Sequence, residues 1–137
     1  SSDQEYRFRA QEDYYNYLKK QHHIIMKIYH NPRCAHSRAG LEYIENKGFD
    51  LEVKKYLSEG LTEMELTEIL RKTGKKPHEL VRTQEALYKS DYKGRNLTDQ
   101  EWIEVLIRHP HLLQRPIVIN GEKAVVAHPP EEIEKII

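Results

Sequence analysis

The chain has 137 residues, which is enough for one domain with an apolar core and too few for two. Hydrophobic residues make up 38% and charged residues 32%, a balance typical of soluble globular proteins rather than of disordered or membrane proteins. Lysine plus arginine equals aspartate plus glutamate at 22 each, so we expect no direct binding to nucleic acid and only local affinity for anions.

Two absences in the sequence bear on where the protein works. No apolar run approaches the roughly 20 residues of a membrane helix, and no secretory leader pattern opens the chain, so we expect a cytoplasmic protein without a membrane partner. One cysteine excludes an internal disulfide and a cysteine-rich zinc site, and we predict no metal site. If this thiol works in redox chemistry, the second sulfur must come from another molecule.

Residues 1–25 differ in composition from the rest. They are rich in tyrosine, carry balanced charges and contain no glycine or proline, which is compatible with one helix. We interpret them as an N-terminal extension or leader, and we expect the folded domain to occupy residues 26–137. The pair His22 and His23 indicates a solvated helix end rather than a metal site.

The domain begins with a strand, a helix and a second strand. Lys27–His30 is predicted as a strand that runs into the polar loop 31–34, and Ser37–Lys47 as a helix that Gly48 ends. Leu51–Tyr56 alternates as a strand, and the right-handed crossover rule makes it parallel to the first.

Helices are predicted for the middle of the chain. Thr62 and Glu65 form a capping box, and Gly74 ends the helix that follows. Pro77–Tyr88 and Thr98–Arg108 are predicted as two further helices, the second with Thr98 as its N-cap.

The chain closes with a predicted hairpin and helix. Pro116–Asn120 and Lys123–Ala127 flank a turn at residues 121–122 and form an antiparallel pair, and Pro129 begins a final helix to Ile137. The order βαβ, helices, ββα predicts an α/β thioredoxin-like fold, with a mixed four-stranded sheet and a helical insertion between its halves.

The single cysteine, Cys34, lies where a strand and its loop enter a helix. An isolated cysteine is most often a small buried apolar residue. Here the backbone N–H groups and positive dipole end of the helix favour a thiolate and also bind oxyanions. Arg33, Arg38 and His30 lie close by in sequence and would lower the pKa of the thiol further. The context therefore favours a reactive thiolate.

Three stretches carry a resemblance to a known family. They are I-Y-H-N-P-R-C-A-H-S-R-A-G-L (28–41), L-V-R-T-Q-E (80–85) and H-P-H-L-L-Q-R-P-I-V-I (109–119). Together they resemble the arsenate reductases that are coupled to glutathione and glutaredoxin, from Met26 to the C-terminus. In that family the cysteine attacks arsenate, glutathione adds to the arsenic, and glutaredoxin reduces the adduct to release arsenite.

The resemblance implies a role for several residues. Cys34 matches the nucleophile and His30 matches a histidine that assists the thiolate, so these two are the predicted catalytic residues. Pro116 matches a proline that is usually cis and would place Arg115 beside Cys34. The predicted oxyanion-binding residues are Arg82, Arg115, His128, Ser37 and Arg38.

His128 departs from the family pattern, because it stands where a third arginine is expected. A histidine is mostly neutral at pH 7 and has no guanidinium fork, so one charge-assisted contact to the anion is weakened or lost. This departure leaves a related oxyanion open as the substrate. The C-x-x-S stretch from Cys34 to Ser37 lacks a second thiol, so glutathione and glutaredoxin are the expected reductants, and no bound cofactor is expected.

Two alternatives remain open from the sequence. Spx-type transcriptional regulators share the fold and the R-P-I-V stretch but bind RNA polymerase. They commonly carry C-x-x-C, so Ser37 and the H-N-P stretch favour the enzyme. The other alternative is a glutathione-dependent reductase of another substrate, which His128 would allow.

Overall fold

The computed structural model describes residues 9–13 and 25–137. Residues 9–13 are helical, and the rest of the predicted N-terminal extension, with His22 and His23, lies outside the described residues. The expectation of a separate extension therefore stays a prediction.

A mixed four-stranded sheet forms the centre of the domain, in the order β2-β1-β3-β4. β1 (Met26–Tyr29) pairs in parallel with β2 (Leu51–Lys54) and antiparallel with β3 (Ile117–Asn120). β3 continues through a hairpin into β4 (Lys123–Val126). The predicted sheet, with its parallel and antiparallel pairs, is confirmed.

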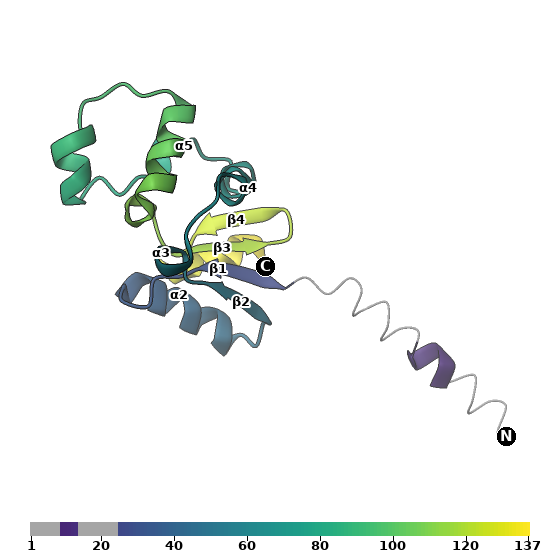
Figure 1. Cartoon of the computed structure of the whole chain (residues 1–137). Helices are drawn as coiled ribbons and strands as arrows, with labels where there is room; N and C mark the ends of the chain where they lie inside the picture. Colours follow the sequence, from purple (N-terminus) through teal and green to yellow (C-terminus); the bar gives the residue numbers. More distant parts are fainter. Residues whose placement is uncertain (1–8, 14–24) are drawn as a thin grey trace, which may run out of the picture.

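Both faces of the sheet are covered, as Figure 1 shows. On one face Tyr29 packs with side chains of α4 and α5, and on the other Ile28 packs with α2 and the C-terminal η4. Successive residues of β1 thus enter opposite cores, as the pleat of a strand requires. The bounds of these helices are Ala35–Asn46 for α2, Glu63–Thr73 for α4, Asp99–Arg108 for α5 and Pro130–Ile136 for η4.

The ends of α4 and α5 follow the sequence signals. Thr62 and Thr98 each accept a hydrogen bond from the backbone of the glutamate three residues later, and both capping boxes are complete. Gly74 ends α4 in the left-handed conformation, with φ of 70°. These predictions depended on local chemistry alone, and they are confirmed.

The predicted helix over Pro77–Tyr88 is wrong. A single 3₁₀ turn, η1, covers Pro77–Leu80, and a π-helical turn, η2, covers Tyr88–Tyr92. Between them Val81 forms an isolated antiparallel bridge with Leu113. That bridge draws the backbone into an extended conformation, which a helix through Val81 could not adopt.

Other boundaries also differ from the prediction: β1 spans Met26–Tyr29 rather than Lys27–His30, and α2 spans Ala35–Asn46 rather than Ser37–Lys47. β2 ends at Lys54, and Tyr56 begins a short helix, α3 (Tyr56–Glu59). A 3₁₀ turn that was not predicted, η3 (Pro110–Leu112), precedes β3. The C-terminal segment is a 3₁₀ helix that begins at Pro130 rather than at Pro129.

Helix α2 approaches the start of β3 closely. A Cβ atom at Gly40 would lie 2.7 Å from Cγ of Pro116, so only glycine fits this contact without movement. The Arg115–Pro116 peptide bond is cis, as expected, and so is His128–Pro129, which was not predicted.

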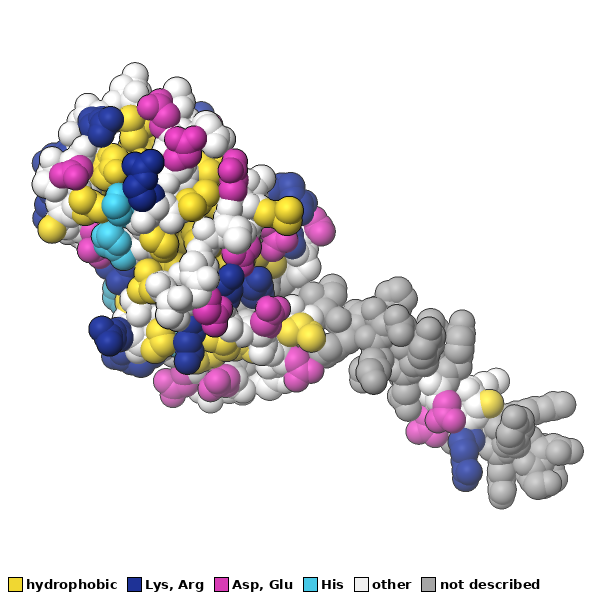
Figure 2. Space-filling model, in the orientation of Figure 1, with side chains coloured by type: hydrophobic (Ala, Val, Ile, Leu, Met, Phe, Trp, Pro, Cys, Tyr) yellow, Lys and Arg dark blue, Asp and Glu magenta, His cyan; other side chains and the backbone are white. Residues whose placement is uncertain are grey.

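The surface carries charges of both signs. In Figure 2 basic and acidic side chains are interspersed on the visible face, in keeping with the net charge of zero. Within the described ranges 9–13 and 25–137, no helix is long and apolar enough to cross a membrane.

Candidate active site

Cys34 is the N-cap residue of α2, with an extended backbone. Two hydrogen bonds to Asn31 hold the loop before it. The N–H of Cys34 donates to the Asn31 carbonyl at 3.0 Å, and the N–H of Arg33 donates to the Asn31 side-chain Oδ1 at 3.1 Å. Ser37 is fully buried, and its Oγ accepts from the N–H of Asn31 at 3.3 Å. The thiol is thus set on a fixed loop at the start of a helix.

The surroundings of Cys34 favour the thiolate. Burial by itself raises the pKa of the thiol. Hydrogen bonds from the backbone of Ser37, the side chain of Arg115 and the backbone of His36 lower it by more, so the pKa lies below its ordinary value. The two backbone donors belong to the first turn of α2, the part of the helix on which the prediction from sequence depends.

Arg82 and Arg115 come from distant segments, and each is anchored on one side. Nε of Arg82 binds Oε1 of Glu85 at 3.0 Å, and Nη1 of Arg115 donates to the carbonyl of His111 at 3.0 Å. The Nε atom of Arg115 is buried, and within the described part of the chain it has no hydrogen-bond partner. Anchoring by single nitrogens leaves other guanidinium N–H groups free to bind an anion.

His128 lies at the same site, against a residue from the first turn of α2. Its ring stacks on that of His36, with ring centroids 3.7 Å apart and an interplanar angle of 20°. Burial lowers the pKa of His36, and so do the charges of His128, Arg82 and Arg115. Both imidazoles are exposed, so the pair forms the solvent side of the site.

His30 and Arg38 lie near one another beside the Cys34 loop, since the charge of Arg38 and the backbone of Ser37 both act on His30. Nη1 of Arg38 donates to the carbonyl of Pro32 at 3.0 Å, and its side chain is exposed. His30 is buried, and burial, with the charge of Lys55, lowers its pKa. Ser37 is a positioning residue. Its hydroxyl accepts from the N–H of Asn31 and so holds the loop, and its backbone N–H lowers the pKa of the Cys34 thiol.

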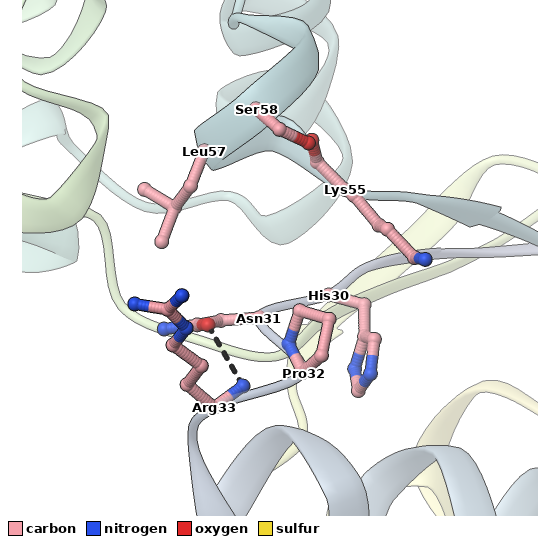
Figure 3. Close-up of a pocket in the computed structure, with 7 residues that line it drawn as sticks. All are labelled: His30, Asn31, Pro32, Arg33, Lys55, Leu57 and Ser58. Atoms are coloured by element: carbon pink, nitrogen blue, oxygen red, sulfur yellow. Dashed lines mark hydrogen bonds between the residues drawn. The ribbon is translucent and has the colours of Figure 1, made fainter.

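A pocket opens beside this loop, on the side of His30 (Figure 3). Figure 3 shows the loop after β1 forming one wall and the start of α3, with Leu57 and Ser58, forming the other. Arg33 and Lys55 supply two basic side chains. The residues that line the pocket are His30, Asn31, Pro32, Arg33, Lys55, Leu57 and Ser58.

Tyr56 is a buried neighbour of these groups that the sequence analysis did not single out. Its side chain is fully buried, and the charges of Arg115, Arg82 and Cys34 all act on its phenol. A signal was available, because Tyr56 follows the carboxyl end of a strand parallel to β1, and side chains at that edge of parallel strands lie together.

This arrangement suits nucleophilic attack on a tetrahedral oxyanion. It combines a thiolate at a helix N-terminus with two arginines, the donors that best match anionic oxygens. Among the residues that the structure describes, no three histidine, cysteine or carboxylate side chains are grouped as metal ligands would be.

Comparisons with known proteins agree with this chemistry. A model of the ArsC family matches residues 29–136. The arsenate reductase of Haemophilus influenzae is 38% identical over 112 residues, which cover 80% of this chain and 97% of that protein. The arsenate reductase of Neisseria meningitidis is 39% identical over 114 residues, covering 82% and 97%. The structure of arsenate reductase from Vibrio cholerae matches with a TM-score of 0.79 at 34% identity, over 83% of this chain and 98% of that one.

The lowered pKa of Cys34 predicts how its reactivity depends on pH. Because the thiolate is the nucleophile, the rate of alkylation by iodoacetamide should rise with pH through a midpoint below the free-thiol value of about 8.5. Arg115→Ala should move this midpoint to higher pH, since it removes a donor to the sulfur. A midpoint at or above that of free cysteine would contradict an activated thiol.

Proposed function

This chain belongs to the ArsC family, and on that premise we propose that it is an arsenate reductase in which the Cys34 thiolate attacks arsenate and an external thiol completes the reduction. The observation that carries the proposal is the position of Cys34 at the start of α2, where Arg115 lowers the pKa of the thiol and the charges of Arg82 and Arg115 both act on His36 of the first helical turn. The sulfur bonds to arsenic while one arsenate oxygen leaves as water. The arginines stabilise the charge on the remaining oxygens.

The electrons for reduction must come from outside the chain, because Cys34 is its single cysteine. We propose glutathione as the thiol that adds to the arsenic, and glutaredoxin as the protein whose thiol then supplies the electrons that convert As(V) to As(III). The pocket beside the Cys34 loop supports this assignment. Its two basic side chains, Arg33 and Lys55, suit the carboxylates of glutathione.

An activity assay tests the proposal directly. Arsenate should drive NADPH oxidation when glutathione, glutaredoxin and glutathione reductase are present, and Cys34→Ser should abolish the rate, since a serine hydroxyl is not ionised at neutral pH. Omission of glutathione should have the same effect. If wild-type protein is inactive with arsenate but still binds oxyanions, it is a reductase of another substrate, and if it does neither, a polymerase-binding role gains support.

The two arginines should dominate anion affinity. A hydrogen bond to a charged group contributes about 1.5–3 kcal/mol, so Arg82→Ala or Arg115→Ala should weaken sulfate or arsenate binding by about tenfold or more. Isothermal titration would measure the affinity, and thermal melting would check that both variants fold. Arg71→Ala is a matched control, because Arg71 pairs with Glu122 on the surface. Unchanged affinity in both site variants would place the anion elsewhere.

His128 should limit anion binding. It stands where the family resemblance places a third arginine, and a histidine has no guanidinium fork to bind the anion. His36 stacks on His128, so variants at position 128 are needed to assign the effect. His128→Asn should bind sulfate no more tightly than wild type, and His128→Arg should strengthen binding at pH 8 by about tenfold.

Sulfate is the better probe for this comparison, because it keeps its charge throughout the pH range whereas arsenate changes protonation near neutrality. Identical sulfate affinities in wild type, His128→Asn and His128→Arg between about pH 5.5 and 8 would show that His128 takes no part in binding.

A further inference from the structure

We infer that the Tyr56 hydroxyl is an additional donor of the anion site, where it and Nε of Arg115 hydrogen-bond the bound oxyanion. The inference rests on the proposed function, because it assigns a substrate contact at the same site. Nothing in the sequence motifs pointed to this residue. It is carried by two buried polar atoms and by the charges around them.

The first observation is that the Tyr56 hydroxyl is buried without a partner. The side chain has no exposed surface, and within the described ranges its oxygen makes no hydrogen bond. An unsatisfied buried polar group costs about 1–3 kcal/mol, so such groups need an explanation. The ring itself is well packed, edge-on to Tyr29 with centroids 6.5 Å apart, so packing fixes the direction of the hydroxyl.

The second observation is the identity of its neighbours. The three charged groups that act on the phenol are Arg115, Arg82 and the Cys34 thiolate, which are the groups of the proposed reaction. Nε of Arg115 is likewise buried and unpartnered among the described residues. The side chain of Arg115 also lies within reach of the phenol oxygen, where it can donate to that oxygen and leave the hydroxyl hydrogen for an acceptor. An oxyanion oxygen beside the nucleophile is such an acceptor.

The protonation state of Tyr56 suits this role. Burial raises the pKa of Tyr56 to about 12, although Arg115 and Arg82 act in the opposite direction. The phenol therefore stays neutral at physiological pH. A neutral hydroxyl donates to the anion without adding negative charge to a site that already holds the Cys34 thiolate.

Tyr29 provides a matched control within the same ring pair. It is also fully buried, and its hydroxyl also has no hydrogen-bond partner among the described residues. Its charged neighbours are acidic, however: burial raises its pKa first, and then Glu65 and Glu68 raise it further. Removing this hydroxyl changes the core in the same way without changing the anion site.

The experiment compares Tyr56→Phe, Tyr29→Phe and Arg115→Ala by titration with sulfate and with arsenate. Phenylalanine keeps the packed ring and removes only the oxygen. We expect Tyr56→Phe to bind both anions about tenfold more weakly, and Tyr29→Phe to bind like wild type. Thermal melting adds a second readout. In anion-free buffer Tyr56→Phe should melt at or above the wild-type temperature, and it should gain less from added sulfate.

The other outcomes separate this inference from the proposed function. Wild-type affinity in Tyr56→Phe with weak binding in Arg115→Ala would overturn the inference and leave the proposed function intact. Equal losses in both tyrosine variants would also overturn it, because the effect would then come from the core. If Arg115→Ala binds like wild type and wild type does not reduce arsenate, the proposed function fails and the inference fails with it.

Discussion

Two backbone hydrogen bonds join the helical insertion to the segment that enters β3. The N–H of Arg82 donates to the carbonyl of Leu112 at 2.7 Å, and the N–H of Gln114 donates to that of Leu80 at 2.8 Å. The bridge stops the insertion from continuing as a helix and holds Arg82 near the segment that carries Arg115. Arg82 and Arg115 belong to different parts of the chain, so these hydrogen bonds fix the position of one segment relative to the other.

The fold could be predicted wherever one local signal decided the structure. The strand signals of β1 to β4, the capping boxes of α4 and α5 and the left-handed Gly74 need only neighbouring residues. The family and the thioredoxin-like fold are confirmed. The prediction over Pro77–Tyr88 failed because its structure depends on Leu113, which is distant in the sequence. Local helical propensity was overridden by a tertiary contact.

The site residues also divide into those with a local sequence signal and those whose position depends on distant parts of the chain. The position of Cys34 followed from a strand, a loop and a helix start, which the sequence displays directly. The relation of Arg82 and Arg115 to it came from the resemblance, because their spacing alone has no local pattern. Arg38 binds the carbonyl of Pro32, a contact that has no signal in the sequence. The position of Tyr56 was open to prediction, because it follows the carboxyl end of a strand parallel to β1, but its burial beside Arg115 and Arg82 needed the three-dimensional structure.

The lone sulfur at the start of α2 also bears on oxidative damage. A thiolate with a lowered pKa is the form of cysteine that peroxide oxidises to a sulfenic acid, and an adjacent thiol normally intercepts that acid before it is oxidised irreversibly. Here the position one helical turn on is the fully buried Ser37, and the chain holds no other cysteine. Rescue of oxidised Cys34 therefore depends on small thiols from solution, so a depleted thiol pool leaves the protein open to permanent inactivation.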